Sequence, residues 1–109
     1  MEERECLELI RRDSTLTTFQ KKVLTVVAGI PRGEVRTYGW VAERAGHSGA
    51  ARAVGGALAK NPYCPEIPCH RVVCSNGSIG GYSGGVFRKK RLLADEGVWP
   101  VVPRRLLKR

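Results

Sequence analysis

A helix made almost entirely of small residues is the feature of this sequence that most limits how the chain can fold. Residues 50–59 carry Ala or Gly at seven of ten positions. The pattern predicts a helix over 49–60, capped by Ser48 and ended by Asn61-Pro62. Each Gly inside a helix costs about 1 kcal/mol relative to Ala. The two glycines therefore indicate that this helix approaches something closely, either a neighbouring helix or a bound molecule.

A shorter helix precedes this one. Thr37 is placed to cap residues 38–45, and Gly46 is placed to end them. Two helices joined by the short turn 46–48 form a helix-turn-helix pattern. Arg52 projects from the small-residue surface of the second helix, where a long isolated cation suits a phosphate contact or insertion between bases. Tight packing on a neighbouring helix remains the structural alternative.

The charge of the chain indicates a polyanionic partner. The formal net charge is +9 over 109 residues, and the pI is near 10.0. Residues 86–109 hold eight basic residues against Asp95 and Glu96, a net charge of +6. Nucleic acid or an anionic membrane face is the expected partner class. For the basic run alone, a solvated tail is the simpler interpretation.

The other parts of the chain predict one small domain with two flanking segments. The first eighteen residues are expected to form a short arm over the core. Thr17 and Gln20 have the form of a capping box that begins a helix over 19–29. A strand-like piece is expected at 70–74. A last helix at 86–95 is expected to expose its basic run, Lys89 included, and to turn Leu92 and Leu93 inward.

No targeting segment is expected. The apolar runs are far shorter than the roughly 20 residues of a membrane span. The charged start, from Glu2 to Glu8, excludes the apolar core of a signal peptide.

Three of the four cysteines surround one histidine, as Cys64-x4-Cys69-His70-x3-Cys74. Without an export signal they are better interpreted as thiols or metal ligands than as disulfides. A zinc site is one interpretation, although adjacent Cys69 and His70 are awkward as joint tetrahedral ligands. A nucleophilic thiolate beside an imidazole, in a segment stiffened by Pro68, is the other. In a regular strand the two side chains point to opposite faces, so proton transfer needs a water relay or an irregular backbone at Pro68.

The chain also contains Ile67-Pro68-Cys69-His70-Arg71-Val72-Val73, which resembles the active-site signature of the O6-alkylguanine-DNA alkyltransferases. Further stretches resemble this family in the same order and at nearly the same spacing, over about residues 19–97. They are Ala50-Ala51-Arg52-Ala53-Val54-Gly55-Gly56-Ala57, Asn61-Pro62, Gly80-Gly81-Tyr82-Ser83-Gly84-Gly85 and Leu92-Leu93-Ala94-Asp95-Glu96-Gly97.

The resemblance implies a mainly α fold with a short strand-like active-site segment, of the winged-helix-like helix-turn-helix type. It divides the chain into an N-terminal arm (1–18), a DNA-binding and active-site domain (19–98) and a basic C-terminal tail (99–109). The implied activity is the irreversible transfer of an alkyl group from O6-alkylguanine in double-stranded DNA to the protein's own cysteine. The protein is then expected to be a cytoplasmic, DNA-associated monomer that needs no cofactor and no metal and uses the minor groove.

Site residues follow from the same resemblance. Cys69 is the implied acceptor, His70 the water-mediated base, and Glu96 the group that polarises His70, a pairing that the position of Glu96 after the cysteine also suggests. Tyr38 is expected to press on the phosphate 3′ to the lesion, Arg52 to fill the gap in the base stack, and Asn61 to brace the turn before the active-site segment. The implied substrate-binding residues are Tyr38, Val72, Tyr82 and Ser83. The implied DNA-binding residues are Gln20, Tyr38, Gly39, His47, Ala51, Arg52, Ala53, Gly55 and Ser75.

Alternatives remain at this stage. Typical family members carry a preceding domain where this chain has only its arm. Similarly short relatives are noncatalytic lesion sensors that lack the acceptor cysteine, and Cys69 argues against that class. A plain helix-turn-helix regulator leaves the Pro68-Cys69-His70 segment unexplained.

Overall fold

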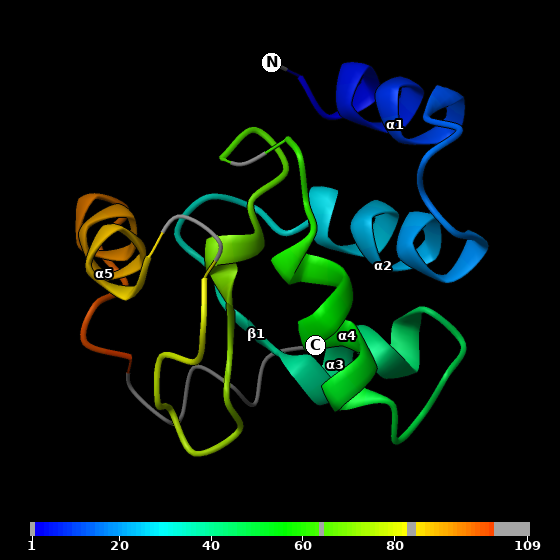
Figure 1. The fold of residues 1–109 in the computed structure, drawn as a ribbon. Coiled ribbons are helices and arrows are strands. Elements are labelled where there is room, and N and C mark those ends of the chain that lie inside the picture. The colour runs from blue at the N-terminus through cyan, green and yellow to red at the C-terminus, as the bar shows by residue number, and fades with distance from the viewer. Residues whose placement is uncertain (1, 64, 83–84, 102–109) are drawn as a thin grey trace.

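The computed structural model describes residues 2–63, 65–82 and 85–101 and shows a mainly helical chain (Figure 1). Within these ranges the elements are, in chain order, α1 (Glu3–Arg12), α2 (Thr18–Ala28), β1 (Arg36–Thr37), α3 (Tyr38–Arg44), α4 (Ala51–Ala59), the 3-10 turn η1 (Cys69–Arg71), β2 (Val72–Val73) and α5 (Val86–Asp95). None of the helices in these ranges has the length and apolarity that crossing a bilayer requires.

α3 and α4 form the predicted helix-turn-helix, so the mainly α, helix-turn-helix fold is confirmed. Thr37 Oγ1 accepts a hydrogen bond from Trp40 N at 3.0 Å and so begins α3. Gly46, at φ +84°, ends it in the left-handed region that glycine adopts without strain. The cap predicted for α4 is wrong: Ser48 lies outside the helix, the N-cap position is Ala50, and no side chain accepts a hydrogen bond there.

α2 begins as the sequence predicts. Gln20 N donates to Thr17 Oγ1 at 3.1 Å, and Thr17 N donates to Gln20 Oε1 at 2.7 Å, which completes the capping box. The arm before it contains a regular helix, α1, which lies along α2 (Figure 1). Cys6 and Ile10 of α1 are buried in the same core cluster as Val23 of α2. The arm is therefore an integral part of the hydrophobic core.

The segment after Pro68 differs from the strand expected at 70–74. Residues 69–71 form the 3-10 turn η1, and only Val72–Val73 is strand. This strand pairs in parallel with β1, with Arg36 opposite Val72 and Thr37 opposite Val73. Two residues are too few for an alternating apolar pattern, so sequence periodicity cannot reveal β1.

α5 has the predicted bounds, but two of its side chains lie differently from the expectation. Lys89 is fully buried rather than exposed, and Leu92 is only half-buried. Lys89 lies four residues before the buried Leu93, so both share the inward face of the helix.

A second, smaller core cluster lies beneath α5. It contains Val35, Val73, Leu93 and Val98, with Trp99 and Val101 packed against it. The first residues of the predicted tail therefore contact the core. The rest of the tail, 102–109, lies outside the described residues.

Candidate active site

A cavity of about 450 Å³ lies between α3, α4, the segment after Pro68 and the glycine-containing loop 80–82. Its lining is mostly apolar and small, which suits a flat, uncharged group. The lining residues are Tyr38, Ala51, Arg52, Gly55, Leu58, Ala59, Cys69, Cys74, Gly80, Gly81 and Tyr82.

The Tyr38 ring can lie in the wall of this cavity because Gly80 has no side chain to collide with it. Gly80 has φ +70°, and a Cβ built on it would lie 2.7 Å from Tyr38 Oη. Any other residue at this position would strain the backbone and displace the tyrosine ring.

Cys69 is 3% exposed and belongs to the lining of the cavity. Its amide donates to Ile67 O at 2.8 Å and closes an inverse γ-turn at Pro68, where φ is −81° and ψ is 63°. The 3-10 turn η1 follows directly, with Arg71 N donating to Pro68 O at 2.9 Å. Successive residues of a 3-10 turn are rotated by about 120° rather than the 180° of a strand. The backbone at Pro68 is thus irregular, so Cys69 and His70 are not forced onto opposite faces.

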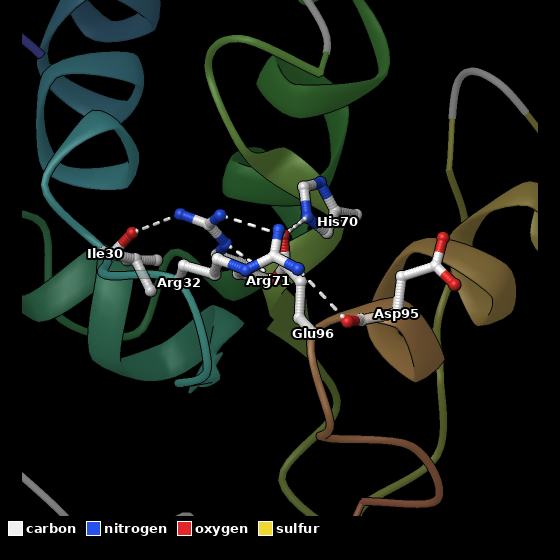
Figure 2. A network of polar contacts seen from close by, with 6 residues as sticks. All are labelled: Ile30, Arg32, His70, Arg71, Asp95 and Glu96. Atoms are coloured by element: carbon white, nitrogen blue, oxygen red, sulfur yellow. Dashed lines mark hydrogen bonds and ion pairs between the residues drawn. The ribbon is translucent and has the colours of Figure 1, made fainter. Parts of the chain in front are cut away.

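Three distant segments meet at the carboxylate of Glu96, whose side chain is 5% exposed (Figure 2). His70 Nε2 lies 3.0 Å from Glu96 Oε2. Arg71 donates through Nε to Oε1 at 2.9 Å and through Nη2 to Oε2 at 2.8 Å, a bidentate pairing. Arg71 Nη1 also donates to Ile30 O at 2.7 Å, which ties the carboxylate to the end of α2.

Arg32 forms the outer, exposed edge of this network. Its Nη2 donates to Asp95 O at 3.1 Å, and its Nη1 lies 3.8 Å from Glu96 Oε2. The sequence pattern indicates neither this arginine nor Arg71 as a partner of Glu96.

The electrostatics of the network keep Glu96 charged and His70 neutral. Burial raises the pKa of the Glu96 carboxyl, but hydrogen bonds from Arg71 and His70 outweigh burial and lower it overall. Burial, together with the charges of Arg71 and Lys89, lowers the pKa of His70 by more than Glu96 raises it. With Nε2–H donating to Glu96, Nδ1 is the nitrogen that can accept a proton. Nδ1 is buried and has no hydrogen-bond partner within the described part of the chain.

Lys89 is a further member of the site that the sequence analysis missed. Its Nζ donates to Val72 O at 2.7 Å and to Gly81 O at 3.1 Å, and it lies 3.4 Å from Tyr38 Oη. Burial lowers the pKa of Lys89 to about 8 and raises the pKa of Tyr38 to about 12. Lys89 thus joins α5 to two walls of the cavity. Its spacing from Leu93 is the signal that could have revealed it.

The residues predicted to bind DNA fall into two groups. Tyr38, Ala51, Arg52 and Gly55 line the cavity, and Arg52 and Ala53 are exposed on α4. The remaining ones lie outside the lining. Among these, Gly39, His47 and Ser75 are exposed and Gln20 is half-buried. The ring of His47 also packs edge-on against Phe19, with centroids 5.1 Å apart.

The predicted substrate-binding residues are also divided. Tyr38 and Tyr82 line the cavity. Val72 does not line it, because its side chain is buried in the core and its carbonyl accepts from Lys89. Ser83 lies outside the described residues.

Asn61 spans the turn between α4 and the segment that leads to Cys69. It is 5% exposed. Its Nδ2 donates to Ile67 O at 3.1 Å, and its Oδ1 accepts from Tyr63 N at 2.9 Å. Both ends of one amide are therefore used to fold this turn.

The cysteines proposed as zinc ligands are placed as follows. Cys69 and Cys74 line the cavity, and Cys64 lies outside the described residues. Among the residues that are described, no group of three His, Cys, Asp or Glu side chains is placed to hold a metal ion.

The fold and the site together define a helix-turn-helix domain with a buried Cys-His-Glu arrangement beside its second helix. The family described as "6-O-methylguanine DNA methyltransferase, DNA binding domain" matches residues 18–98. The chain belongs to this family.

Individual relatives agree with this assignment. A methylated-DNA–protein-cysteine methyltransferase of Methanothermobacter thermautotrophicus is 56% identical over 82 residues, which is 75% of this chain and 46% of that protein. The crystal structure of Mycobacterium tuberculosis OGT in complex with DNA has a TM-score of 0.74 and 46% identity, and the match covers 75% of this chain and 50% of that one. S. pombe Atl1, solved with damaged DNA containing O6-carboxymethylguanine, has a TM-score of 0.66 and 38% identity, over 73% of this chain and 76% of that one. The chain thus spans about half the length of the curated methyltransferase it matches.

Proposed function

We propose that this chain is a DNA repair protein that transfers an alkyl group from the O6 atom of guanine in double-stranded DNA to Cys69. The observation that carries the proposal is the position of Cys69, in the wall of a cavity beside α4 and next in sequence to the His70–Glu96 pair. The methyltransferase relative and the OGT structure with DNA support it.

In the proposed step the Cys69 thiolate attacks the alkyl carbon. A sulfur–carbon bond forms, the carbon–O6 bond breaks, and its electron pair stays with the base, which takes up one proton to become guanine. His70 Nδ1 receives the thiol proton through a water molecule, and Glu96 stabilises the resulting imidazolium at Nε2. The thioether is retained, so each molecule acts once. The step uses no cofactor and no metal.

DNA recognition is assigned to the helix-turn-helix. The small residues of α4 allow the helix to enter the narrow minor groove, and Arg52 fills the gap that the extruded nucleotide leaves. Tyr38 turns the nucleotide by pressing on the phosphate 3′ to it, and the base enters the cavity between Tyr38 and Tyr82, with Ser83 nearby. Extrusion costs a few kcal/mol and least for a damaged pair, which favours the lesion.

The other proposed contacts complete this picture. Phosphate contacts from the basic surface supply the affinity that does not depend on sequence. The protein is proposed to act as a cytoplasmic monomer. The further DNA contacts are proposed at Gln20, Gly39, His47, Ala51, Ala53, Gly55 and Ser75, with Val72 close to the substrate.

The test is a mass measurement after one turnover. Incubation with one equivalent of duplex DNA containing O6-methylguanine is expected to add a single methyl group to the peptide that carries Cys69. C69S is expected to form no adduct, whereas C74S, which alters a second cysteine of the same cavity, is expected to retain it. Tight binding of the lesion without any adduct on folded wild-type protein would replace the proposal with a noncatalytic lesion sensor.

Replacement of Arg52 is expected to lower the repair rate on duplex DNA much more than the repair rate on single-stranded DNA. R52A is expected to slow repair of a duplex by about tenfold, because only a duplex needs the gap in its stack filled. Repair of the same lesion in a single strand should change little. The measurement is the single-turnover rate on both substrates, and an equal loss on both would contradict the role as stack filler.

A further inference from the structure

We propose that helix α1 is a positioning element for the acceptor cysteine, acting through a hydrogen bond between Asp13 and Tyr63. This inference rests on the proposed alkyl transfer to Cys69. α1 precedes residues 18–98, which the family match covers, so nothing in that match assigns it a role in the chemistry.

α1 holds the segment that leads to Cys69 at two points. Tyr63 Oη donates to Asp13 Oδ2 at 2.6 Å, and Asp13 is the residue that ends α1. Near the other end of the helix, Cys6 Sγ donates to Glu66 O at 3.5 Å. In Figure 1 the loop between α4 and η1 accordingly rises toward α1. These two contacts, one from the first half of α1 and one from the residue that ends it, hold the loop in a fixed position relative to the helix.

The Asp13 carboxylate is itself oriented. Its Oδ1 accepts from Thr15 N at 2.8 Å, which leaves Oδ2 directed at Tyr63. Tyr63 gains a charged acceptor whose position is set by the turn between α1 and α2. Hydrogen bonds to charged groups are stronger than those between neutral groups.

A short chain of hydrogen bonds runs from Tyr63 to the acceptor residue. Tyr63 O accepts from Ile67 N at 2.8 Å, and Ile67 O accepts from Cys69 N at 2.8 Å. The Asn61 amide closes the same loop through Tyr63 N and Ile67 O. A shift of the Tyr63 backbone is therefore transmitted to the Cys69 backbone in two steps.

Side-chain packing also connects α1 with the segment that carries Cys69. Cys6 and Ile10 of α1 are 2% and 1% exposed, and they share one core cluster with Ile67 and Cys69. Because interiors are packed as densely as organic crystals, this shared core transmits displacement instead of absorbing it. The attack of sulfur on an alkyl carbon requires close alignment of the reacting atoms. The geometry thus makes α1 part of the support for that alignment.

The experiment compares Y63F, D13N and the double variant with wild-type protein. Y63F removes one hydroxyl from a half-buried ring and leaves the rest of the loop intact. E8Q is the matched control, since Glu8 lies on the same helix and makes exposed ion pairs with Arg11 and Arg12. Three quantities are measured: the alkyl-transfer rate at saturating DNA, the affinity for DNA, and residue-resolved amide hydrogen exchange.

Y63F and D13N are each expected to lower the alkyl-transfer rate by about three- to tenfold, and the double variant by no more than the larger single loss, because all three remove the same charge-assisted hydrogen bond. DNA affinity should stay unchanged. Amides of Ile67 and Cys69 are expected to exchange about tenfold faster, whereas Val27 of α2 and Leu58 of α4 keep their protection. E8Q should match wild type in every measurement.

Unchanged transfer rates in Y63F would overturn the inference, as would a lower rate without faster exchange at Ile67 and Cys69. Additive losses in the double variant would also overturn it. If wild-type protein formed no adduct at all, the proposed function would fail. The exchange data would then decide by themselves whether α1 holds this loop.

Discussion

E96Q is expected to slow alkyl transfer to Cys69 by about 100- to 1,000-fold at pH 7, within the range that general acid–base groups contribute. A neutral amide cannot stabilise the imidazolium that forms when His70 takes the thiol proton. The change also leaves the Arg71 guanidinium, now 2.8 and 2.9 Å from carboxylate oxygens, without its anion. Breaking a buried pair in this way costs about 3 to 5 kcal/mol of stability. Single-turnover rates and denaturant unfolding measure the two effects separately.

Two further variants keep this prediction decisive. D95N alters the neighbouring carboxylate, which points away from the network in Figure 2, and should leave the rate unchanged. E96D keeps the charge on a shorter side chain and should recover part of the rate. If folded E96Q transferred alkyl groups as fast as wild type, Glu96 would have no part in activating the thiol.

R71Q is expected to move the acid limb of the rate–pH profile to higher pH. In wild-type protein the pKa of His70 is lowered, chiefly by burial and also by the Arg71 charge. The rate should therefore persist below the ordinary pKa of histidine, about 6.5, and fall only as pH drops through the lowered value. Without Arg71, Glu96 keeps His70 and the more distant, exposed Arg32 as partners. The charge that opposed the imidazolium is gone, so the pKa of His70 rises.

At pH 6 the loss in R71Q is expected to be roughly 20- to 50-fold, because the base is more protonated and the carboxylate is less well fixed. The measurement is the single-turnover rate between pH 5 and 8, with folded fraction followed in parallel. A uniform loss at every pH would show that Arg71 only supports the fold. R71K restores the charge but not the bidentate geometry, and should return the limb toward its wild-type position.

Local sequence signals were sufficient for part of the helical framework. The capping box at Thr17 and Gln20, the cap at Thr37 and the stop at Gly46 predict the start of α2 and both ends of α3. These signals act within one turn of helix, so they can be read without knowledge of tertiary contacts. The second helix of the helix-turn-helix, α4, was predicted from its small residues instead, and its expected cap at Ser48 is wrong.

The neighbours of Glu96 could be predicted only in part. The resemblance placed Glu96 beside His70, and the two atoms are 3.0 Å apart. Arg71 and Arg32 were not predicted as partners, because no sequence pattern indicates which acceptor an arginine side chain binds. Lys89 was assigned to the solvent because it lies in a basic run. Its burial depends on three acceptors, Val72 O, Gly81 O and Tyr38 Oη, that only the folded chain brings together.

The local backbone geometry at Pro68 also could not be predicted from the sequence. A run of Val and Cys suggests a strand, yet residues 69–71 form a 3-10 turn, because Arg71 N donates to Pro68 O across three residues. Directly before it, Cys69 N donates to Ile67 O and closes an inverse γ-turn at Pro68. Such short-range bonds compete with sheet pairing. Which residues become strand depends on the parallel partner, Arg36–Thr37, which lies more than thirty residues earlier in the chain.

The hydrogen-bond network around the Glu96 carboxylate has a consequence during synthesis of the protein. Glu96 is 26 residues beyond His70 and is the C-cap residue of α5. Its partner Arg71 also binds Ile30 O, just after α2. Until translation has passed this point and the final helix has docked, the imidazole has no anion beside it. On the proposed mechanism, the growing polypeptide therefore lacks the group that activates the Cys69 thiol, so a protein proposed to react only once is not consumed by small electrophiles before it has folded.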